Sequence, residues 1–108
     1  MKYSTNHWNN INKVYILLIK IPKGKVSTYK AVSQATGIHP RAVSRILHAN
    51  KEPEKYPCYK IVKSDGRLGG YGGPGGVKRK KELLERDGIE IMNGKVDLKK
   101  YLHIFSKI

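Results

Sequence analysis

The chain has 108 residues, enough for one compact domain. Apolar residues make up 39% and charged residues 28%, a composition typical of a folded domain and not of a disordered segment. Its 22 Lys and Arg residues against 8 Asp and Glu give a formal net charge of +14, more than solubility requires. This excess predicts a polyanionic partner: nucleic acid first, an anionic membrane surface second, with a lysine-rich chain that binds no polyanion as the alternative.

Several classes of protein are disfavoured at once. The one long apolar run, residues 14–21, is interrupted by Lys20 and is too short to span a bilayer. Residues 1–10 are polar and lack the apolar core of a signal peptide. The single cysteine, Cys58, excludes an internal disulfide, and four scattered histidines give no metal-ligand cluster. We therefore expect a cytoplasmic protein with no membrane segment and no metal site.

The first elements in chain order are helical. A helix is predicted over residues 12–21, because Val14, Leu17, Leu18 and Ile21 have the i, i+3, i+4, i+7 spacing of a core-facing stripe. Val26 is expected in a short strand. Ser27 or Thr28 can then cap a helix that runs to residue 36 and that the following glycine closes.

A second helix follows after only two residues. It starts at Pro40, carries Val43, Ile46 and Leu47 at helical spacing, and ends near residue 49. Two helices joined by a tight glycine turn outline a helix-turn-helix, although a helical hairpin in an ordinary core gives the same pattern. Five basic residues lie on or just past this helix, on a face that would meet DNA or simply be solvated: Arg41, Arg45, His48, Lys51 and Lys55.

The second half of the chain mixes short strands, glycine and one helix. Residues 59–62 are predicted as a strand, residues 64–66 as its turn, and residues 69–76 as a glycine-dense loop that contains Tyr71. A basic helix over residues 77–87 brings Leu83 and Leu84 to the core, and Gly88 closes it. Residues 89–92 and 95–98 around Asn93-Gly94 predict a hairpin. The fold class is mainly α with small β elements, an α+β domain.

Cys58 is the candidate nucleophile. Pro57 precedes it at the end of a loop, a placement that fixes the backbone and can aim the thiol into a pocket instead of burying it. Lys55, Lys60 and the positive field of the chain can lower the thiol pKa. A lone cysteine is otherwise a small apolar core residue.

An ordered series of short segments carries a resemblance. The segments are residues 24–29 (GKVSTY), 40–43 (PRAV), Asn50, 57–62 (PCYKIV) and 70–73 (GYGG). From about Val14 to Gly88 they resemble the C-terminal domain of the O6-alkylguanine-DNA alkyltransferases. The resemblance implies a winged helix-turn-helix that flips the damaged nucleotide out of double-stranded DNA and moves its alkyl group irreversibly to a cysteine. It implies no metal or organic cofactor, and we expect a monomer.

The resemblance also assigns roles by position. Cys58 resembles the alkyl acceptor, Asn50 the residue that orders the loop beside it, and Arg41 the arginine that fills the space of the flipped base. Tyr29 resembles the tyrosine that contacts a phosphate and donates a proton to guanine, and Tyr71 the tyrosine of the base pocket. The remaining expected DNA contacts are Ala42, Arg45 and Lys60.

Three positions depart from the family pattern. Tyr59 stands where the family has a histidine in a proton relay, and with an ordinary pKa of about 10 it is a weaker acceptor. Lys60 replaces an arginine and loses its bidentate fork. Asp87 occupies the position at which the family usually has the glutamate of the relay. Slower transfer is one expected consequence; the alternative is an alkyltransferase-like protein that binds lesions without repairing them.

Two further alternatives concern domain organisation and class. The N-terminal domain of many family members is not expected, because about a dozen residues precede the first helix. We expect the chain to be either a minimal form or a domain of a longer, fused or associated repair protein.

The alternative functional class is a winged-helix transcription regulator. Such a regulator would prefer particular duplex sequences, whereas a protein that recognises damage is nearly blind to sequence.

Overall fold

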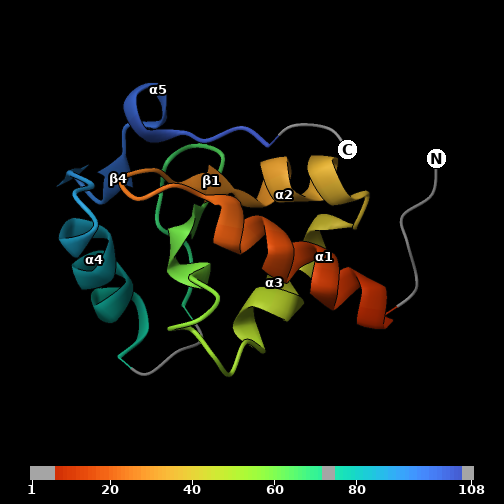
Figure 1. Ribbon diagram of the computed structural model, residues 1–108. Helices are drawn as coiled ribbons and strands as arrows, with labels where there is room; N and C mark the ends of the chain where they lie inside the picture. The colour runs from red at the N-terminus through yellow and green to blue at the C-terminus, as the bar shows by residue number, and fades with distance from the viewer. Residues whose placement is uncertain (1–6, 72–74, 106–108) are drawn as a thin grey trace.

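The computed structural model describes residues 7–71 and 75–105, and these form a mainly helical α+β fold with two small sheets, as the sequence predicts (Figure 1). The helices are α1 (His7–Lys20), α2 (Tyr29–Thr36), α3 (Pro40–His48), α4 (Gly76–Arg86) and α5 (Leu98–Tyr101). The strands are β1 (Ser27–Thr28), β2 (Ile61–Val62), β3 (Ile91–Met92) and β4 (Lys95–Val96), and a 3₁₀ turn spans Cys58–Lys60. Within the described ranges, no helix is long and apolar enough to cross a membrane.

Helices α1, α2 and α3 pack around what we call the helical core. Its buried members are Val14, Leu17, Leu18, Ile21, Val32, Ile38, Val43, Ile46, Leu47, Cys58, Ile61 and Phe105. The predicted caps are present: Ala31 N donates to Thr28 Oγ1 at 3.0 Å, and Gly37 closes α2 with a φ of 73°. With Pro40 in the first turn of α3, helices α2 and α3 form the predicted helix-turn-helix.

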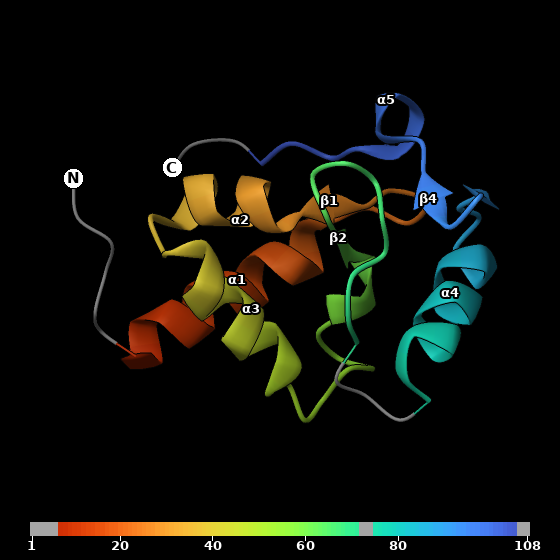
Figure 2. The ribbon, with the colours of Figure 1, turned by 180° about the vertical axis from the view of Figure 1, so that it is seen from behind.

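A second core lies beside the first. It contains Val26, Val62, Leu68, Leu84, Ile89, Val96 and Tyr101. The parallel pair β1–β2 stands between α4 on one side and α1–α3 on the other in both views (Figures 1 and 2). Because Ile61 belongs to the helical core and Val62 to the second core, this short strand joins the two.

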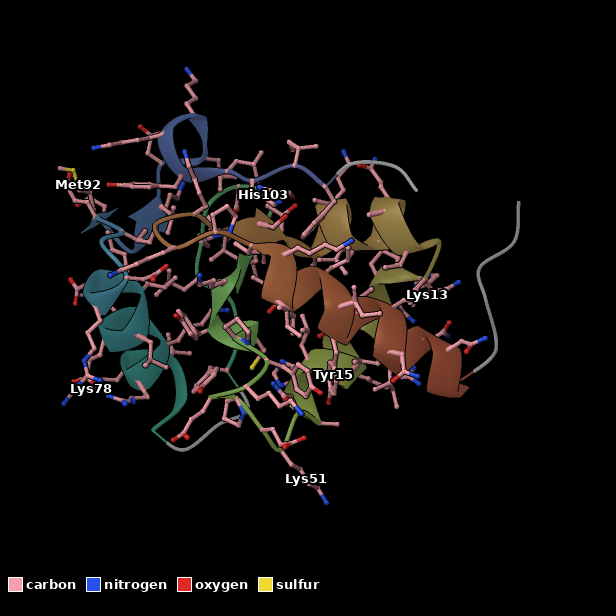
Figure 3. All side chains as sticks on the ribbon, in the orientation of Figure 1. Lys13, Tyr15, Lys51, Lys78, Met92 and His103 are labelled. Atoms are coloured by element: carbon pink, nitrogen blue, oxygen red, sulfur yellow. The ribbon has the colours of Figure 1, made fainter. Side chains whose placement is uncertain are left out.

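The C-terminal segment follows the predicted hairpin and then departs from it. Asn93 and Gly94 have φ values of 54° and 74°, as a two-residue turn between β3 and β4 requires. The expected second strand to residue 98 is too long, because Asp97 accepts from Lys99 N at 3.0 Å and starts α5. Beyond α5, His103 N donates to Val26 O at 2.7 Å, which lays this segment along β1 (Figure 3).

The predicted strand over residues 59–62 is half wrong. Only Ile61 and Val62 are extended, whereas the preceding three residues form the 3₁₀ turn, closed by Lys60 N donating to Pro57 O at 3.1 Å. A strand would have put Tyr59 and Ile61 on one face. The turn separates them, so that Ile61 packs in the helical core and Tyr59 against the second core. Of the predicted glycine loop, residues 72–74 lie outside the described residues.

Candidate functional site

Cys58 lies where the two cores meet. It is the first residue of the 3₁₀ turn and belongs to the helical core, while its neighbour Tyr59 packs against the second core. The side chain is a free thiol and only 7% exposed. The expectation that Pro57 keeps the thiol from being buried is therefore wrong, because the turn carries Cys58 inward. Any reaction partner must reach it through the surrounding side chains.

Burial sets the protonation of this thiol. Burial raises the pKa of Cys58 above its ordinary value, and a hydrogen bond from Asn50 and the charge of Lys80 lower that pKa in part. The lysines expected to help point elsewhere: the Lys55 ammonium lies 5.3 Å from the centre of the Tyr56 ring, and Lys60 is paired with a carboxylate. The free protein thus holds the thiol in its neutral form near pH 7.

Asn50 orders the loop beside the cysteine, as expected. It is buried just after α3, where its Nδ2 donates to Tyr56 O at 2.8 Å and its Oδ1 accepts from Glu52 N at 2.9 Å. Tyr56 also stacks on Tyr15, with ring centroids 4.3 Å apart. These contacts fix the chain that leads into Pro57 and hold the Asn50 amide near the thiol.

Lys80 is the site residue that sequence reasoning missed. It is 1% exposed on α4, and its Nζ donates to Ile61 O at 2.6 Å and to Gly70 O at 3.2 Å. Burial lowers its pKa to about 8, opposed by the negative charge of the Cys58 thiolate. The signal was present: residues 80, 84 and 87 follow the i, i+4, i+7 spacing of an inward face. Through this inward face, α4 brings the positive charge of Lys80 to where it lowers the pKa of Cys58.

Lys60 and Asp87 form a buried ion pair. Lys60 is 6% exposed; its Nζ lies 3.3 Å from Asp87 Oδ2 and donates to Pro22 O at 3.2 Å. Asp87 Oδ2 also accepts from Gly24 N at 2.9 Å. The expectation of Lys60 as a DNA contact is wrong, since its ammonium is turned into the protein. Asp87, expected to act in a relay through Tyr59, uses this oxygen to tie the end of α4 to the turn that follows α1.

The tyrosines around the thiol are held in their neutral form. Burial raises the pKa of Tyr29, and the negative charge of a Cys58 thiolate raises it further. The pKa of Tyr59 is raised by burial first, then by the charge of Asp87. At neutral pH both hydroxyls therefore keep their protons. Tyr29 therefore has a proton to donate, and Tyr59, being protonated itself, has no free base with which to accept one.

Tyr29 is also approached closely by backbone. A Cβ atom at Gly69, where φ is 73°, would lie 3.3 Å from the Tyr29 hydroxyl oxygen. The Lys80 ammonium lies 5.9 Å from the centre of the Tyr29 ring. The glycine loop and α4 therefore both approach this tyrosine.

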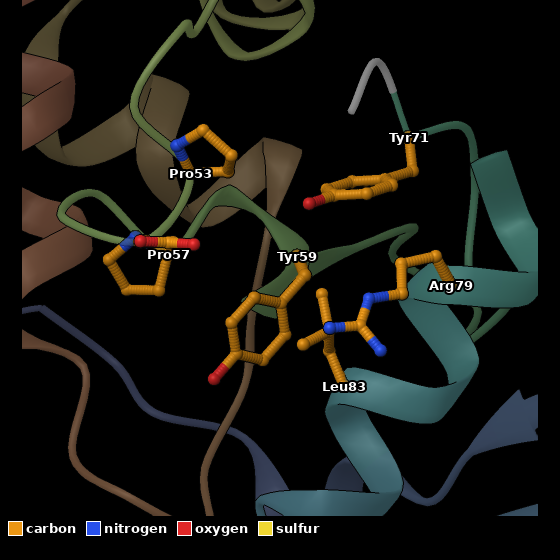
Figure 4. A pocket seen from close by; sticks show the side chains of 7 residues that line it. Pro53, Pro57, Tyr59, Tyr71, Arg79 and Leu83 are labelled. Carbon is orange, nitrogen blue, oxygen red and sulfur yellow. The ribbon is translucent and has the colours of Figure 1, made fainter. Parts of the chain in front are cut away.

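A pocket of about 490 Å³ opens beside Pro57 and Tyr59, the chain neighbours of the cysteine (Figure 4). Its lining residues are Pro53, Glu54, Pro57, Tyr59, Tyr71, Arg79 and Leu83. The pKa of Tyr71 is raised by burial and by the charge of a Cys58 thiolate, so this pocket residue is electrostatically coupled to the thiol. We call this space the side pocket. It is large enough to hold an organic group of several atoms.

The helix-turn-helix presents a basic surface. Arg41 and Arg45 are exposed on α3, and Lys51 extends into solvent just beyond it (Figure 3). Ala42 is half-buried and packs on the helical core, so only part of it reaches the surface. Within the described part of the chain, no group of three or more His, Cys, Asp and Glu residues could hold a metal ion.

Comparisons with known proteins give the family. A family model described as 6-O-methylguanine DNA methyltransferase, DNA binding domain, matches residues 10–89. The bifunctional methyltransferase/endonuclease of Picrophilus torridus is 46% identical over 90 residues, 82% of this chain and 30% of that protein. The methylated-DNA--protein-cysteine methyltransferase of Pyrobaculum aerophilum is 42% identical over 80 residues, 74% of this chain and 53% of that protein. This chain thus spans between about a third and about half of these curated relatives.

Solved structures agree with the sequence comparisons. S. pombe Atl1, in complex with damaged DNA containing O6-carboxymethylguanine, matches with a TM-score of 0.79 and 27% identity, over 88% of this chain and 94% of that chain. The O6-methylguanine-DNA methyltransferase of Pyrococcus kodakaraensis strain KOD1 matches with a TM-score of 0.66 and 37% identity, over 73% of this chain and 46% of that chain. The chain therefore belongs to the 6-O-methylguanine DNA methyltransferase family, which comprises DNA alkyltransferases and alkyltransferase-like proteins that bind damaged DNA.

Proposed function

We propose that this protein binds double-stranded DNA that contains O6-alkylguanine and transfers the alkyl group irreversibly to Cys58. The observation that carries the proposal is the surrounding of the one free thiol. Asn50 and Lys80 oppose the effect of burial and favour the charged form of the thiol, Tyr29 retains its proton, and the side pocket is lined by Pro57 and Tyr59, the chain neighbours of the cysteine. Together these supply a nucleophile, a proton donor and space for the alkyl group.

The basic face of the helix-turn-helix supports the DNA-binding part. Exposed arginines on α3 can neutralise phosphates while the helix lies in a groove. Because Cys58 is buried, the alkylated guanine has to leave the base stack to reach it. In this proposal Arg41 fills the gap in the stack, and Tyr29 contacts the phosphate of the flipped nucleotide.

The chemical step is a displacement at carbon. Cys58 loses its proton, and the thiolate attacks the alkyl carbon bonded to O6 of guanine. The S–C bond forms while the C–O6 bond breaks, and the bonding pair stays on guanine. Tyr29 donates a proton to the base, and the proton released by the thiol restores the tyrosine, so the products are a thioether and guanine. The positive charge of Lys80 stabilises the thiolate until attack.

A second candidate function is lesion binding without transfer. It is favoured by the burial that raises the pKa of Cys58 and by Tyr59, whose raised pKa keeps it protonated and so unable to take the proton of the thiol. The similarity to S. pombe Atl1 over most of both chains also supports it. In this version the protein marks the lesion for another repair activity. The two candidates share the DNA surface and the pocket and differ only in whether the thiol reacts.

Mass spectrometry of the intact protein distinguishes the two candidates. The protein is incubated with a duplex that carries one O6-methylguanine, in parallel with the Cys58→Ser variant and with an unmodified duplex. Transfer predicts one added methyl group that maps to Cys58 in the parent and is absent from the variant. An unmodified protein that still binds the lesion more tightly than guanine would sink the transfer proposal and support the second candidate.

A further inference from the structure

The side pocket is placed to hold the outer atoms of the alkyl group. Pro57 and Tyr59, the chain neighbours of Cys58, both line it, and so does Tyr71, whose pKa is raised by burial and by the charge of a Cys58 thiolate. In the proposed transfer the first alkyl carbon has to touch the Cys58 sulfur. Whatever the alkyl group carries beyond that carbon then extends into the side pocket, so the chemistry of the walls decides which groups fit.

One wall of the side pocket is a cation. Arg79 reaches from α4 toward the space between Tyr59 and Tyr71 (Figure 4). Its positive charge acts to lower the pKa of Tyr71, which lines the same pocket. The other walls include Pro53, Pro57 and Leu83. A charge beside such apolar walls is less screened than a charge in open water, so it acts more strongly on a bound group.

The guanidinium is held in place without being neutralised strongly. Its ion pair is with Glu82, one turn along the same helix, at 3.8 Å and with side-chain exposures of 38% and 52%. Pairs of this length and exposure contribute little. The backbone keeps Arg79 close to the turn before α4: a Cβ at Gly75, where φ is 89°, would lie 2.7 Å from the Arg79 Cβ. Only glycine allows this approach without displacing the arginine.

We propose that the side pocket selects O6-alkyl groups that end in a carboxylate and that Arg79 is the residue that recognises them. This inference rests on the proposed binding of O6-alkylguanine. Glu54, which also lines the pocket, opposes it, but Glu54 is exposed and its charge is screened by water. Arg79 is half-buried and presents planar N–H donors that match a carboxylate. The cation therefore decides the preference.

The test compares two lesions that differ in charge and hardly in size. Duplexes carry O6-carboxymethylguanine or its neutral amide, O6-carbamoylmethylguanine, and affinities are measured in the Cys58→Ser background so that the lesion is not consumed. With Arg79 present, the acidic lesion is expected to bind about tenfold more tightly than the amide. Arg79→Gln should bring this ratio close to one, and Glu54→Gln should raise it.

A matched variant separates pocket recognition from general attraction to DNA. Arg86 is exposed on the same helix but is absent from the pocket lining, so Arg86→Gln removes the same charge. This variant should weaken binding to both duplexes by the same factor and leave the ratio of the two affinities unchanged. Equal affinity for the two lesions in the parent, or an unchanged ratio in Arg79→Gln, overturns the inference. If neither lesion binds more tightly than guanine, the proposed function itself fails.

Discussion

The two cores of this molecule are held together by different means. The helical core is built from aliphatic side chains on three helices, with the caps and turns that ordinary helices need. The second core is joined to it by two buried lysines: Lys60 binds Asp87 and the carbonyl of Pro22, and Lys80 binds the carbonyls of Ile61 and Gly70. Cys58 lies at the junction. The comparison teaches that one half presents exposed arginines on α3, for which we propose DNA binding, and that the charged junction acts on the protonation of the thiol.

The largest expected effect tests how tightly the second core is assembled. At Gly66, where φ is 91°, a Cβ would lie 2.5 Å from the Val96 carbonyl oxygen, a backbone atom that cannot turn aside. Val96 N also donates to Gly66 O at 2.8 Å. We expect Gly66→Ala to lower the free energy of unfolding by about 3 kcal/mol or more, measured by urea denaturation.

Gly94→Ala is the matched control for this substitution. Gly94 has a φ of 74°, but a Cβ there meets no atom within 4 Å. Gly94→Ala should lower the free energy of unfolding by only about 1 kcal/mol, which is the cost of holding alanine in the left-handed conformation. Equal losses in the two variants would mean that close packing of the turn on β4 does not stabilise the second core.

The sequence predicts the helical core far better than the junction. Periodic apolar positions, a Thr28 cap and a glycine at position 37 are local signals, and each is confirmed. The burial of Lys60 depends on the carbonyl of a distant segment, which no local pattern reveals. For Lys80, the helical spacing indicates the inward face but not the carbonyls that accept from its ammonium. A lysine is ordinarily exposed, so its default interpretation points to solvent. The inward turn of Cys58 has the same origin, because it follows from the packing of both cores.

The second prediction concerns the polar support of the thiol on the side of the helical core. Asn50→Ala removes the hydrogen bonds to Tyr56 O and from Glu52 N, and the loss of the amide near Cys58 raises the thiol pKa. Since these groups are partly buried, we expect the free energy of unfolding to fall by about 2 kcal/mol. Asn12→Ala, on the exposed face of α1, is the control and should change it little. A small loss at both positions would contradict the role of Asn50 in ordering the loop.

The third prediction uses the depressed pKa of Lys80. Burial lowers this pKa from 10.5 in the unfolded chain to about 8 in the folded protein. Between these two values the unfolded chain binds more protons, so Lys80 makes the free energy of unfolding rise with pH. In Lys80→Met no group titrates at this position, so this contribution to the rise in the free energy of unfolding is absent. From about pH 7.5 to about pH 9.5, the difference between parent and variant should move by about 2 kcal/mol in favour of the parent.

Parallel denaturation curves of parent and variant at several pH values measure this difference. Since Lys80 also lowers the pKa of Cys58, Lys80→Met should slow alkyl transfer near neutral pH, with duplex DNA and with free O6-alkylguanine alike. A pH-independent difference in stability would mean that Lys80 is not charged differently in the two states. A rate unchanged by the substitution would remove Lys80 from the activation of the thiol.

The last prediction separates the helix-turn-helix, for which DNA binding is proposed, from the junction. Arg41 is exposed on α3, where it can enter the base stack only if a stack is present. Arg41→Ala should therefore slow transfer from a duplex about tenfold and leave the reaction with the free alkylated base unchanged. Arg86→Ala, an exposed arginine on α4, is the charge-matched control and should slow the duplex reaction less. Equal losses on duplex and free base would place Arg41 with Lys80 among the residues that act on the thiol, and the division between the two halves would not hold.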